Sequence, residues 1–205
     1  MKVCGLTVPE EARACAELGV WGIGVVFAPE SPRRVDAARA AEVLAAVPAG
    51  VARVGVFLAA PPAEMAAVAR RASLTHLQVH ECDPAEARRA AGLPVIEGIR
   101  VTGPAALERA RASAADMVML DAAVPGRHGG TGRRFDWGLL REHPLERPFV
   151  LAGGLRPGNV GEAVGLLRPA IVDVSSGVES APGRKDPELV RAFVEAVAAA
   201  GTVAA

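Results

Sequence analysis

The sequence of 205 residues contains no tyrosine, and aromatic residues make up only 3% of it. Hydrophobic residues as a whole account for 51% of the chain, so the core must be built mainly from alanine, valine and leucine side chains. A chain of this length folds into one or perhaps two globular domains. We therefore expect a globular protein with an aliphatic core.

An excess of charge is also missing, because 23 Lys and Arg residues balance 23 Asp and Glu residues for a formal net charge of +0. Balanced charge provides no electrostatic footprint for nucleic acid or for an anionic membrane surface. No apolar run reaches the roughly 18 residues of a membrane span, and the chain begins with Met1-Lys2-Val3-Cys4 rather than a signal peptide. We expect a cytoplasmic protein that binds a small molecule and neither nucleic acid nor a membrane.

Cysteine is scarce, with Cys4, Cys15 and Cys82 at unrelated spacings. An odd number of cysteines argues against a disulfide framework, and these spacings do not fit a thiolate zinc site. His80 precedes Cys82 by two positions, but a lone H-x-C pair is too sparse to hold a metal ion. We expect reduced thiols and no metal.

Short apolar runs alternate with helical patterns along the whole chain, which is typical of a parallel α/β fold. The predicted strands are Lys2–Gly5, Gly22–Phe27, Arg53–Leu58, His76–Val79, Val95–Arg100, Met117–Leu120, Phe149–Ala152 and Ala170–Val174. They begin about 20 to 30 residues apart without a linker. The pattern predicts one domain over residues 1–205, a single (β/α)8 barrel. An open doubly wound sheet is the alternative, but no G-x-G-x-x-G follows the first strand.

Two turns of small residues follow the last two predicted strands: Gly153-Gly154 after the first and Ser175-Ser176-Gly177 after the second. A strand, a helix and a further parallel strand form a right-handed unit, so both turns emerge at the same edge of the sheet. Backbone N–H groups at such turns can approach an oxyanion closely. Because barrels commonly bind a substrate phosphate beyond strands seven and eight, we expect these five residues to bind a phosphate group of a small-molecule substrate.

Polar residues also stand at other strand ends, where barrel enzymes carry their function. They are Cys4, Arg33, Arg34, Gln78, His80, Arg100 and Asp121. A thiol has a reference pKa of about 8.5 and can act as a base where its surroundings favour the thiolate, although Cys4 could equally be a small core residue. A half-buried carboxyl such as Asp121 often acts as a general acid because desolvation raises its pKa. A helix cap or a loop ion pair with Arg127 is the other interpretation of Asp121.

Two further features bear on the site. Asp173 lies within the last strand rather than beyond it, so we expect it to support the barrel interior. The glycine-rich loop over residues 122–134, which contains Gly130, is either merely flexible or a lid that excludes water.

With these residues placed, the chain resembles the phosphoribosylanthranilate isomerase family of tryptophan biosynthesis. The resemblance rests on motifs in the same order along almost the whole chain: Lys2-Val3-Cys4-Gly5-Leu6-Thr7, Ser31-Pro32-Arg33, Arg53-Val54-Gly55-Val56-Phe57, Leu77-Gln78-Val79-His80, Leu120-Asp121, Gly129-Gly130-Thr131-Gly132, Phe135-Asp136-Trp137, Ala152-Gly153-Gly154-Leu155 and Val172-Asp173-Val174-Ser175-Ser176-Gly177-Val178-Glu179. Together these motifs are highly specific.

The resemblance implies a barrel that converts N-(5′-phosphoribosyl)anthranilate into 1-(2-carboxyphenylamino)-1-deoxyribulose 5-phosphate, an Amadori rearrangement without a cofactor. It implies Cys4 as general base, Asp121 as general acid, and Arg33, His80 and Gly130 among the substrate-binding residues. The family's Ser-x-Arg spacing favours Arg33 over Arg34 as the partner of the anthranilate carboxylate. A monomer and a homodimer are both compatible with it.

The sequence departs from the family pattern at two positions. Glu81 follows His80 where family members usually have glycine, and Arg34 stands where an aromatic residue is common. These departures leave open the role of His80 and the choice between Arg33 and Arg34.

Two other functions compete with this one. The histidine-pathway isomerase runs the same chemistry on a larger phosphosugar, but it typically has an aspartate where Cys4 stands and two similar halves. A phosphosugar-binding barrel without turnover would need neither Cys4 nor Asp121.

Overall fold

The computed structural model describes residues 1–122 and 137–201, and its eight central strands form a closed parallel barrel. Each strand pairs with the next one along the chain, and the last pairs back onto the first. The strands are β1 (Lys2–Cys4), β2 (Gly22–Val26), β3 (Ala52–Leu58), β4 (His76–His80), β5 (Val95–Val101), β6 (Met117–Ala122), β7 (Phe149–Leu151) and β8 (Ile171–Val174). The predicted (β/α)8 barrel is confirmed, with strand ends that differ from the prediction by one or two residues.

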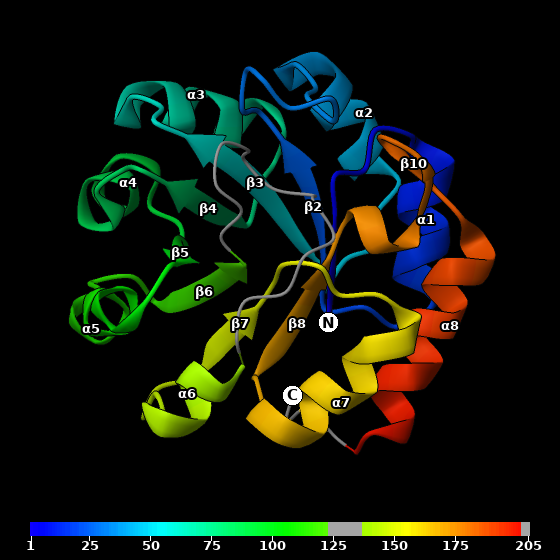
Figure 1. Ribbon diagram of the computed structural model, residues 1–205. Coiled ribbons are helices and arrows are strands. Elements are labelled where there is room, and N and C mark those ends of the chain that lie inside the picture. The colour runs from blue at the N-terminus through cyan, green and yellow to red at the C-terminus, as the bar shows by residue number, and fades with distance from the viewer. Residues whose placement is uncertain (123–136, 202–205) are drawn as a thin grey trace.

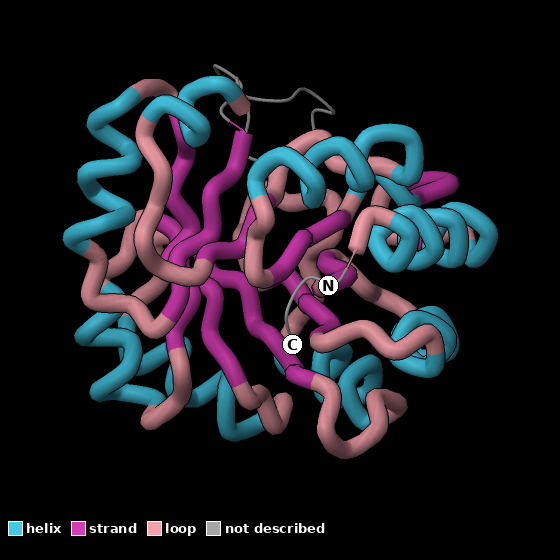
Figure 2. Tube along the Cα trace, turned by 90° about the horizontal axis from the view of Figure 1, so that it is seen from below, coloured by secondary structure: helices cyan, strands magenta, loops and turns pink. Residues whose placement is uncertain are grey.

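Helices surround the strands, as Figures 1 and 2 show from two directions. They are α1 (Pro9–Glu17), α2 (Ala37–Ala45), α3 (Pro62–Arg71), α4 (Pro84–Ala91), α5 (Pro104–Ala112), α6 (Gly138–Glu142), α7 (Pro157–Leu167) and α8 (Pro187–Ala199). Six of these helices begin at a proline, whose fixed φ suits a first turn and whose missing N–H leaves no donor unpaired there. Asp36, Asp83 and Asp186 accept hydrogen bonds from the first backbone N–H groups of α2, α4 and α8.

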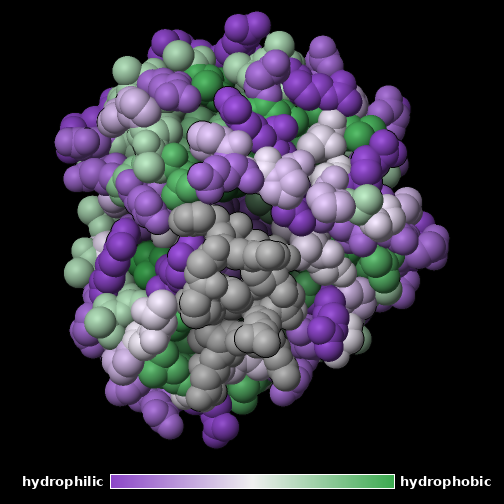
Figure 3. Space-filling view, turned by 45° about the horizontal axis from the view of Figure 1, so that its top comes forward, coloured by the Kyte–Doolittle hydropathy of each residue, from purple (hydrophilic) through white to green (hydrophobic). Residues whose placement is uncertain are grey.

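Two layers of side chains fill the molecule. The larger layer lies between the strands and the helices and includes Phe57, Leu107 and Phe193. The smaller one comprises one cluster of Ile96, Met119, Val150, Ala152 and Ile171 and another of Cys4, Val26 and Val56 beside the cavity. Their strand positions alternate with those of the outer layer and so face the barrel interior. In Figure 3 hydrophilic side chains dominate the visible face, with small hydrophobic patches between them.

The segment between β8 and α8 forms structure that the sequence pattern does not predict. A short 3-10 helix, η1 (Ser176–Val178), leads into an antiparallel hairpin of β9 (Glu179–Ala181) and β10 (Arg184–Lys185). Gly183 in its turn has a φ of 78°, a value that favours glycine. This hairpin brings Glu179 and Lys185 to the end of the barrel where the strands finish.

Among the described residues, no helix is both long and apolar enough to cross a membrane.

Candidate active site

A cavity of about 790 Å³ opens at the end of the barrel where the strands finish. It brings together all the predicted site residues that the structure describes: Cys4, Arg33, His80, Asp121, Gly153, Gly154, Ser175, Ser176 and Gly177. Gly130 and the glycine-rich loop beyond residue 122 lie outside the described residues. Gln78, Arg100 and Asp173 line the same cavity.

Cys4 ends β1 with its side chain in the barrel interior and 7% of its surface exposed. Gly24, its partner on β2, makes room for the thiol, because a Cβ built there would lie 2.8 Å from Sγ. Burial raises the pKa of the Cys4 thiol; the Lys2 ammonium opposes this rise, Asp173 adds to it, and Lys185 opposes it more weakly. The thiol is therefore held among two cations and one carboxylate.

Lys2 and Asp173 form an ion pair inside the barrel, with Nζ 2.6 Å from Oδ1 and the lysine side chain 0% exposed. Burial acts to lower the pKa of Lys2, but the Asp173 carboxylate and Cys4 outweigh it and raise that pKa. Lys2 therefore keeps its positive charge in the interior.

Asp121 lies within β6, which continues two residues beyond the predicted strand end, to Ala122. Its side chain is half-buried and lines the cavity, and its register partner on β5 is Arg100. The position near the strand end agrees with the sequence prediction.

His80 occupies a space that Gly98 of β5 provides, since a Cβ at Gly98 would overlap the imidazole ring. Nε2 of His80 lies 2.9 Å from Nε2 of Gln78, which is buried on the same strand. Oε1 of Gln78 is buried and has no hydrogen-bond partner among the described residues. Glu81, the residue that departs from the family pattern, is exposed and has a φ of 55°, so it adopts the left-handed conformation that glycine adopts without strain.

Arg33 lines the cavity, whereas Arg34 is exposed and is not among the lining residues. Nε and Nη2 of Arg33 lie 2.8 and 2.7 Å from the two carboxylate oxygens of Glu179. Lys185, almost fully buried, also binds Glu179, with Nζ 2.7 Å from Oε1. Burial acts to raise the pKa of Glu179, but the hydrogen bonds from Arg33 and Lys185 lower it. Arg33 and Lys185 therefore share one carboxylate, and burial lowers the pKa of the Lys185 ammonium.

The two turns of small residues meet at the opening of the barrel. Gly153 and Gly154 have φ values of 91° and 65°, and a Cβ at Gly177 would overlap the backbone of Leu155. Asn159 in the first turn of α7 fixes the first of the two turns by donating to the carbonyl of Gly154 at 2.9 Å and accepting from the N–H of Arg156 at 2.8 Å. The two turns, Gly153-Gly154 and Ser175-Ser176-Gly177, are therefore packed against each other, and together they are called the predicted anion cup below.

The donors of this cup are available. Within the described residues, the backbone N–H groups of Gly153, Gly154 and Ser176 donate no hydrogen bond to a backbone carbonyl. Helix α7 begins three residues after Gly154, so its positive end adds to the attraction for an anion.

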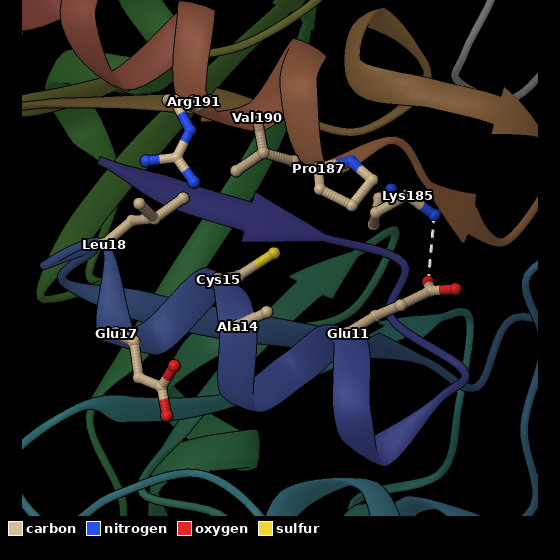
Figure 4. Close-up of a pocket in the computed structure, with 9 residues that line it drawn as sticks. All are labelled: Glu11, Ala14, Cys15, Glu17, Leu18, Lys185, Pro187, Val190 and Arg191. Carbon is tan, nitrogen blue, oxygen red and sulfur yellow. Dashed lines mark hydrogen bonds between the residues drawn. The ribbon is translucent and has the colours of Figure 1, made fainter.

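A second cavity, of about 170 Å³, lies between α1 and α8 on the outer side of β1 (Figure 4). Cys15 lines it but is 3% exposed, and burial raises the pKa of its thiol to about 11. The carboxylate of Glu11 accepts a hydrogen bond from the backbone N–H of Lys185 beside it. A thiol with that pKa is protonated at neutral pH, and Cys15 packs as a residue of the hydrophobic core.

No three His, Cys, Asp or Glu side chains of residues 1–122 and 137–201 lie together in a way that could hold a metal ion.

Several residues of the site were not predicted from the sequence. Lys185 comes from the unpredicted hairpin, and no sequence signal distinguishes it. Lys2 carries a signal that can be read, because a lysine two residues before Cys4 on a strand shares its inward face. Gly24 and Gly98 make room for functional side chains, which only the strand register reveals.

Fold and site define a (β/α)8-barrel protein whose cavity combines a buried thiol, a carboxylic acid, an arginine and an anion cup. The model of the N-(5′-phosphoribosyl)anthranilate (PRA) isomerase family matches residues 1–196, and the chain belongs to this family. It is therefore an isomerase of tryptophan biosynthesis, in the aldose–ketose class of intramolecular oxidoreductases.

Known members of the family are similar to this chain along nearly its whole length. N-(5′-phosphoribosyl)anthranilate isomerase of Acidithiobacillus ferrooxidans is 45% identical over 199 residues, which cover 96% of each protein. The crystal structure of phosphoribosyl anthranilate isomerase from Thermotoga maritima has a TM-score of 0.87 at 36% identity and covers 97% of this chain and 98% of its own. A phosphoribosyl anthranilate isomerase in complex with reduced 1-(o-carboxyphenylamino)-1-deoxyribulose 5-phosphate has a TM-score of 0.83 at 34% identity, with 97% of each chain covered.

Proposed function

We propose that the chain converts N-(5′-phosphoribosyl)anthranilate into 1-(2-carboxyphenylamino)-1-deoxyribulose 5-phosphate without a cofactor, with Cys4 as general base and Asp121 as general acid. The observation that carries this proposal is that the thiol and the carboxyl line one cavity, together with the two turns after β7 and β8. A binding protein without turnover would need the anion cup but neither of these two groups.

The reaction needs one proton delivered and one removed. A protonated Asp121 gives its proton to the furanose ring oxygen, the bond from that oxygen to C1′ breaks, and the anilino nitrogen forms an iminium with C1′. The iminium acidifies the proton on C2′, which the Cys4 thiolate removes. The electrons of that C–H bond form the C1′–C2′ double bond of an enolamine, which becomes the ketone by tautomerisation. Substrate and product are isomers, so no oxidant or reductant is consumed.

The substrate carries a phosphate at one end and a carboxylate at the other, and the cavity has groups that could bind each of them. The phosphate fits the cup, where Gly153, Gly154 and Ser176 offer backbone N–H groups and where Ser175 and Gly177 complete the second turn. The carboxylate on the aromatic ring fits Arg33, because Nη1 of Arg33 makes no hydrogen bond to a described residue and a planar guanidinium binds carboxylates well. His80 and Gly130 belong to the same proposed binding site.

The proposal extends to the organisation of the protein. The closed barrel supports a single domain over residues 1–205. A cytoplasmic location, a monomeric or homodimeric state and a lack of nucleic-acid or membrane partners stay predictions, of which light scattering after size-exclusion chromatography tests the oligomeric state.

One assay tests the activity itself. Freshly prepared N-(5′-phosphoribosyl)anthranilate is mixed with the purified protein, and its fluorescence is followed as it is consumed. We expect catalysed decay, and the histidine-pathway substrate, tested in parallel, should turn over far more slowly. If the protein binds the anthranilate substrate but does not catalyse its decay, it is a non-catalytic phosphosugar-binding barrel. If it converts the histidine-pathway substrate faster, its main activity is that of the histidine-pathway isomerase.

A further inference from the structure

Lys2 and Asp173 form their ion pair directly below Cys4, on the side away from the cavity opening. Lys2 and Cys4 are two residues apart on β1, so their side chains point to the same face of the strand. Asp173 is the register partner of Lys2 on β8. The pair is therefore placed by the strand register itself, one residue layer deeper than the thiol.

Stability does not explain a charged pair at this depth. Burying two ions costs several kcal/mol each, and well-packed hydrophobic residues often serve as well or better. The same barrel interior is filled elsewhere by apolar side chains such as Ile96, Val150 and Ile171. A lysine with 0% exposure and one carboxylate partner thus calls for a reason other than packing.

The thiol of Cys4 lies on the same face of β1 as the ammonium of Lys2, one residue layer above it, and the two groups interact electrostatically. A nearby cation stabilises a thiolate relative to the thiol. Asp173 acts in the opposite direction, because its negative charge disfavours a second anion nearby.

We propose that Lys2 is a positioning residue for the catalytic base: its ammonium stabilises the Cys4 thiolate from below, and Asp173 limits the strength of this effect. The catalytic part of the inference rests on the proposed function, in which Cys4 takes the C2′ proton. The electrostatic part concerns only the thiol and stands independently of turnover.

Other charged groups also face Cys4. Lys185 reaches it from β10 and Arg33 from the segment after β2, and both of these cations are bound to Glu179. The residues of β2 and β3 that pack with the thiol, Gly24, Val26 and Val56, carry no charge. Of the cations, Lys2 has the strongest influence on Cys4.

The test measures the pH dependence of Cys4 alkylation by iodoacetamide, followed by mass spectrometry, in a background that carries Cys15→Ala and Cys82→Ala. Because the thiolate is the reactive form, Lys2→Met should move the alkylation midpoint to higher pH. At a fixed pH below the midpoint, the reaction should slow roughly tenfold for each pH unit that the midpoint moves. Asp173→Asn should move the midpoint to lower pH. Arg34→Met removes an exposed cation outside the cavity and should leave the midpoint unchanged.

Midpoints that move in opposite directions in the two variants support the proposal, and a merely structural pair would not produce them. Midpoints equal to that of the parent, or displaced in the same direction, would overturn it. If circular dichroism shows that Lys2→Met does not fold, the test compares Asp173→Asn with the double variant Lys2→Met/Asp173→Asn. The proposal then predicts a higher alkylation midpoint in the double variant than in Asp173→Asn. Turnover by Cys4→Ala would instead refute the base assignment, whatever the alkylation profiles show.

Discussion

The guanidinium of Arg33 is held along one edge by Glu179, with Nε and Nη2 at 2.8 and 2.7 Å from its two oxygens. The stem of Arg33 passes over Gly5, where a Cβ would lie 2.5 Å from its Cδ. The arginine is thus fixed before substrate arrives, which reduces the conformational entropy lost on binding. Its neighbour Arg34 is exposed.

The first prediction separates these two arginines. A substrate analogue built on aniline lacks only the ring carboxylate, and a lost charged hydrogen-bond partner costs about 1.5 to 3 kcal/mol. Wild-type protein should therefore prefer the natural substrate in kcat/KM by roughly ten- to hundredfold. Arg33→Ala should erase most of this preference and Arg34→Ala should preserve it. The reverse pattern would assign the carboxylate to Arg34.

A second prediction concerns Glu179, whose side chain is 4% exposed. Its pKa in the folded state is lowered below the ordinary value of 4.5, so the stability it contributes is fully present above about pH 4.5 and is lost as the pH falls through the folded-state pKa. Glu179→Gln should lower the free energy of unfolding by about 2 kcal/mol at pH 7, and the deficit should shrink below pH 4.5.

The control for that experiment is Glu42→Gln, which removes the exposed ion pair with Arg39. Exposed pairs of this kind contribute little, so the free energy of unfolding should change by less than about 0.5 kcal/mol. A Glu179→Gln deficit that stays constant down to pH 3 would show that the carboxylate charge is not what matters.

The third prediction tests the phosphate cup. Gly154 has a φ of 65°, and a β-branched side chain there would obstruct the approach of an anion to the backbone. Gly154→Val should raise KM with a smaller effect on kcat, because the phosphate is remote from the reacting carbons. Gly165→Val, in the last turn of α7 with nothing within 4 Å of an added Cβ, serves as a control with unchanged KM. An unchanged KM in folded Gly154→Val would place the phosphate elsewhere.

A fourth prediction uses the strained backbone of Glu81. A non-glycine residue in the left-handed region costs of order 1 to 3 kcal/mol. Glycine removes this cost, but its greater freedom in the unfolded chain cancels part of the stability gained. Glu81→Gly should raise the free energy of unfolding by about 1 kcal/mol. The control Glu64→Gly lies in α3, where glycine should lower it by about 1 kcal/mol. Equal destabilisation of both variants would contradict a strained Glu81.

The barrel could be predicted from the sequence because each strand is a short apolar run that ends in a polar or small residue. Cys4 and Asp121 could be found for the same reason, since each ends or nearly ends such a run. The hairpin of β9 and β10 could not, because strands of three and two residues are too short to show alternation. The contact of Lys2 with Asp173 depends on the register between β1 and β8, which single apolar runs do not specify.

The central claim is that Cys4 and Asp121 are the base and the acid of one reaction, and turnover by Cys4→Ala and Asp121→Asn tests it most directly. A positioned acid or base contributes roughly 10²- to 10⁴-fold to the rate, so kcat measured by loss of substrate fluorescence should fall at least about a hundredfold in each variant. Binding of the reduced product analogue, measured by calorimetry, should persist in both because the anion cup is intact. Near wild-type kcat in either folded variant would contradict the assignment.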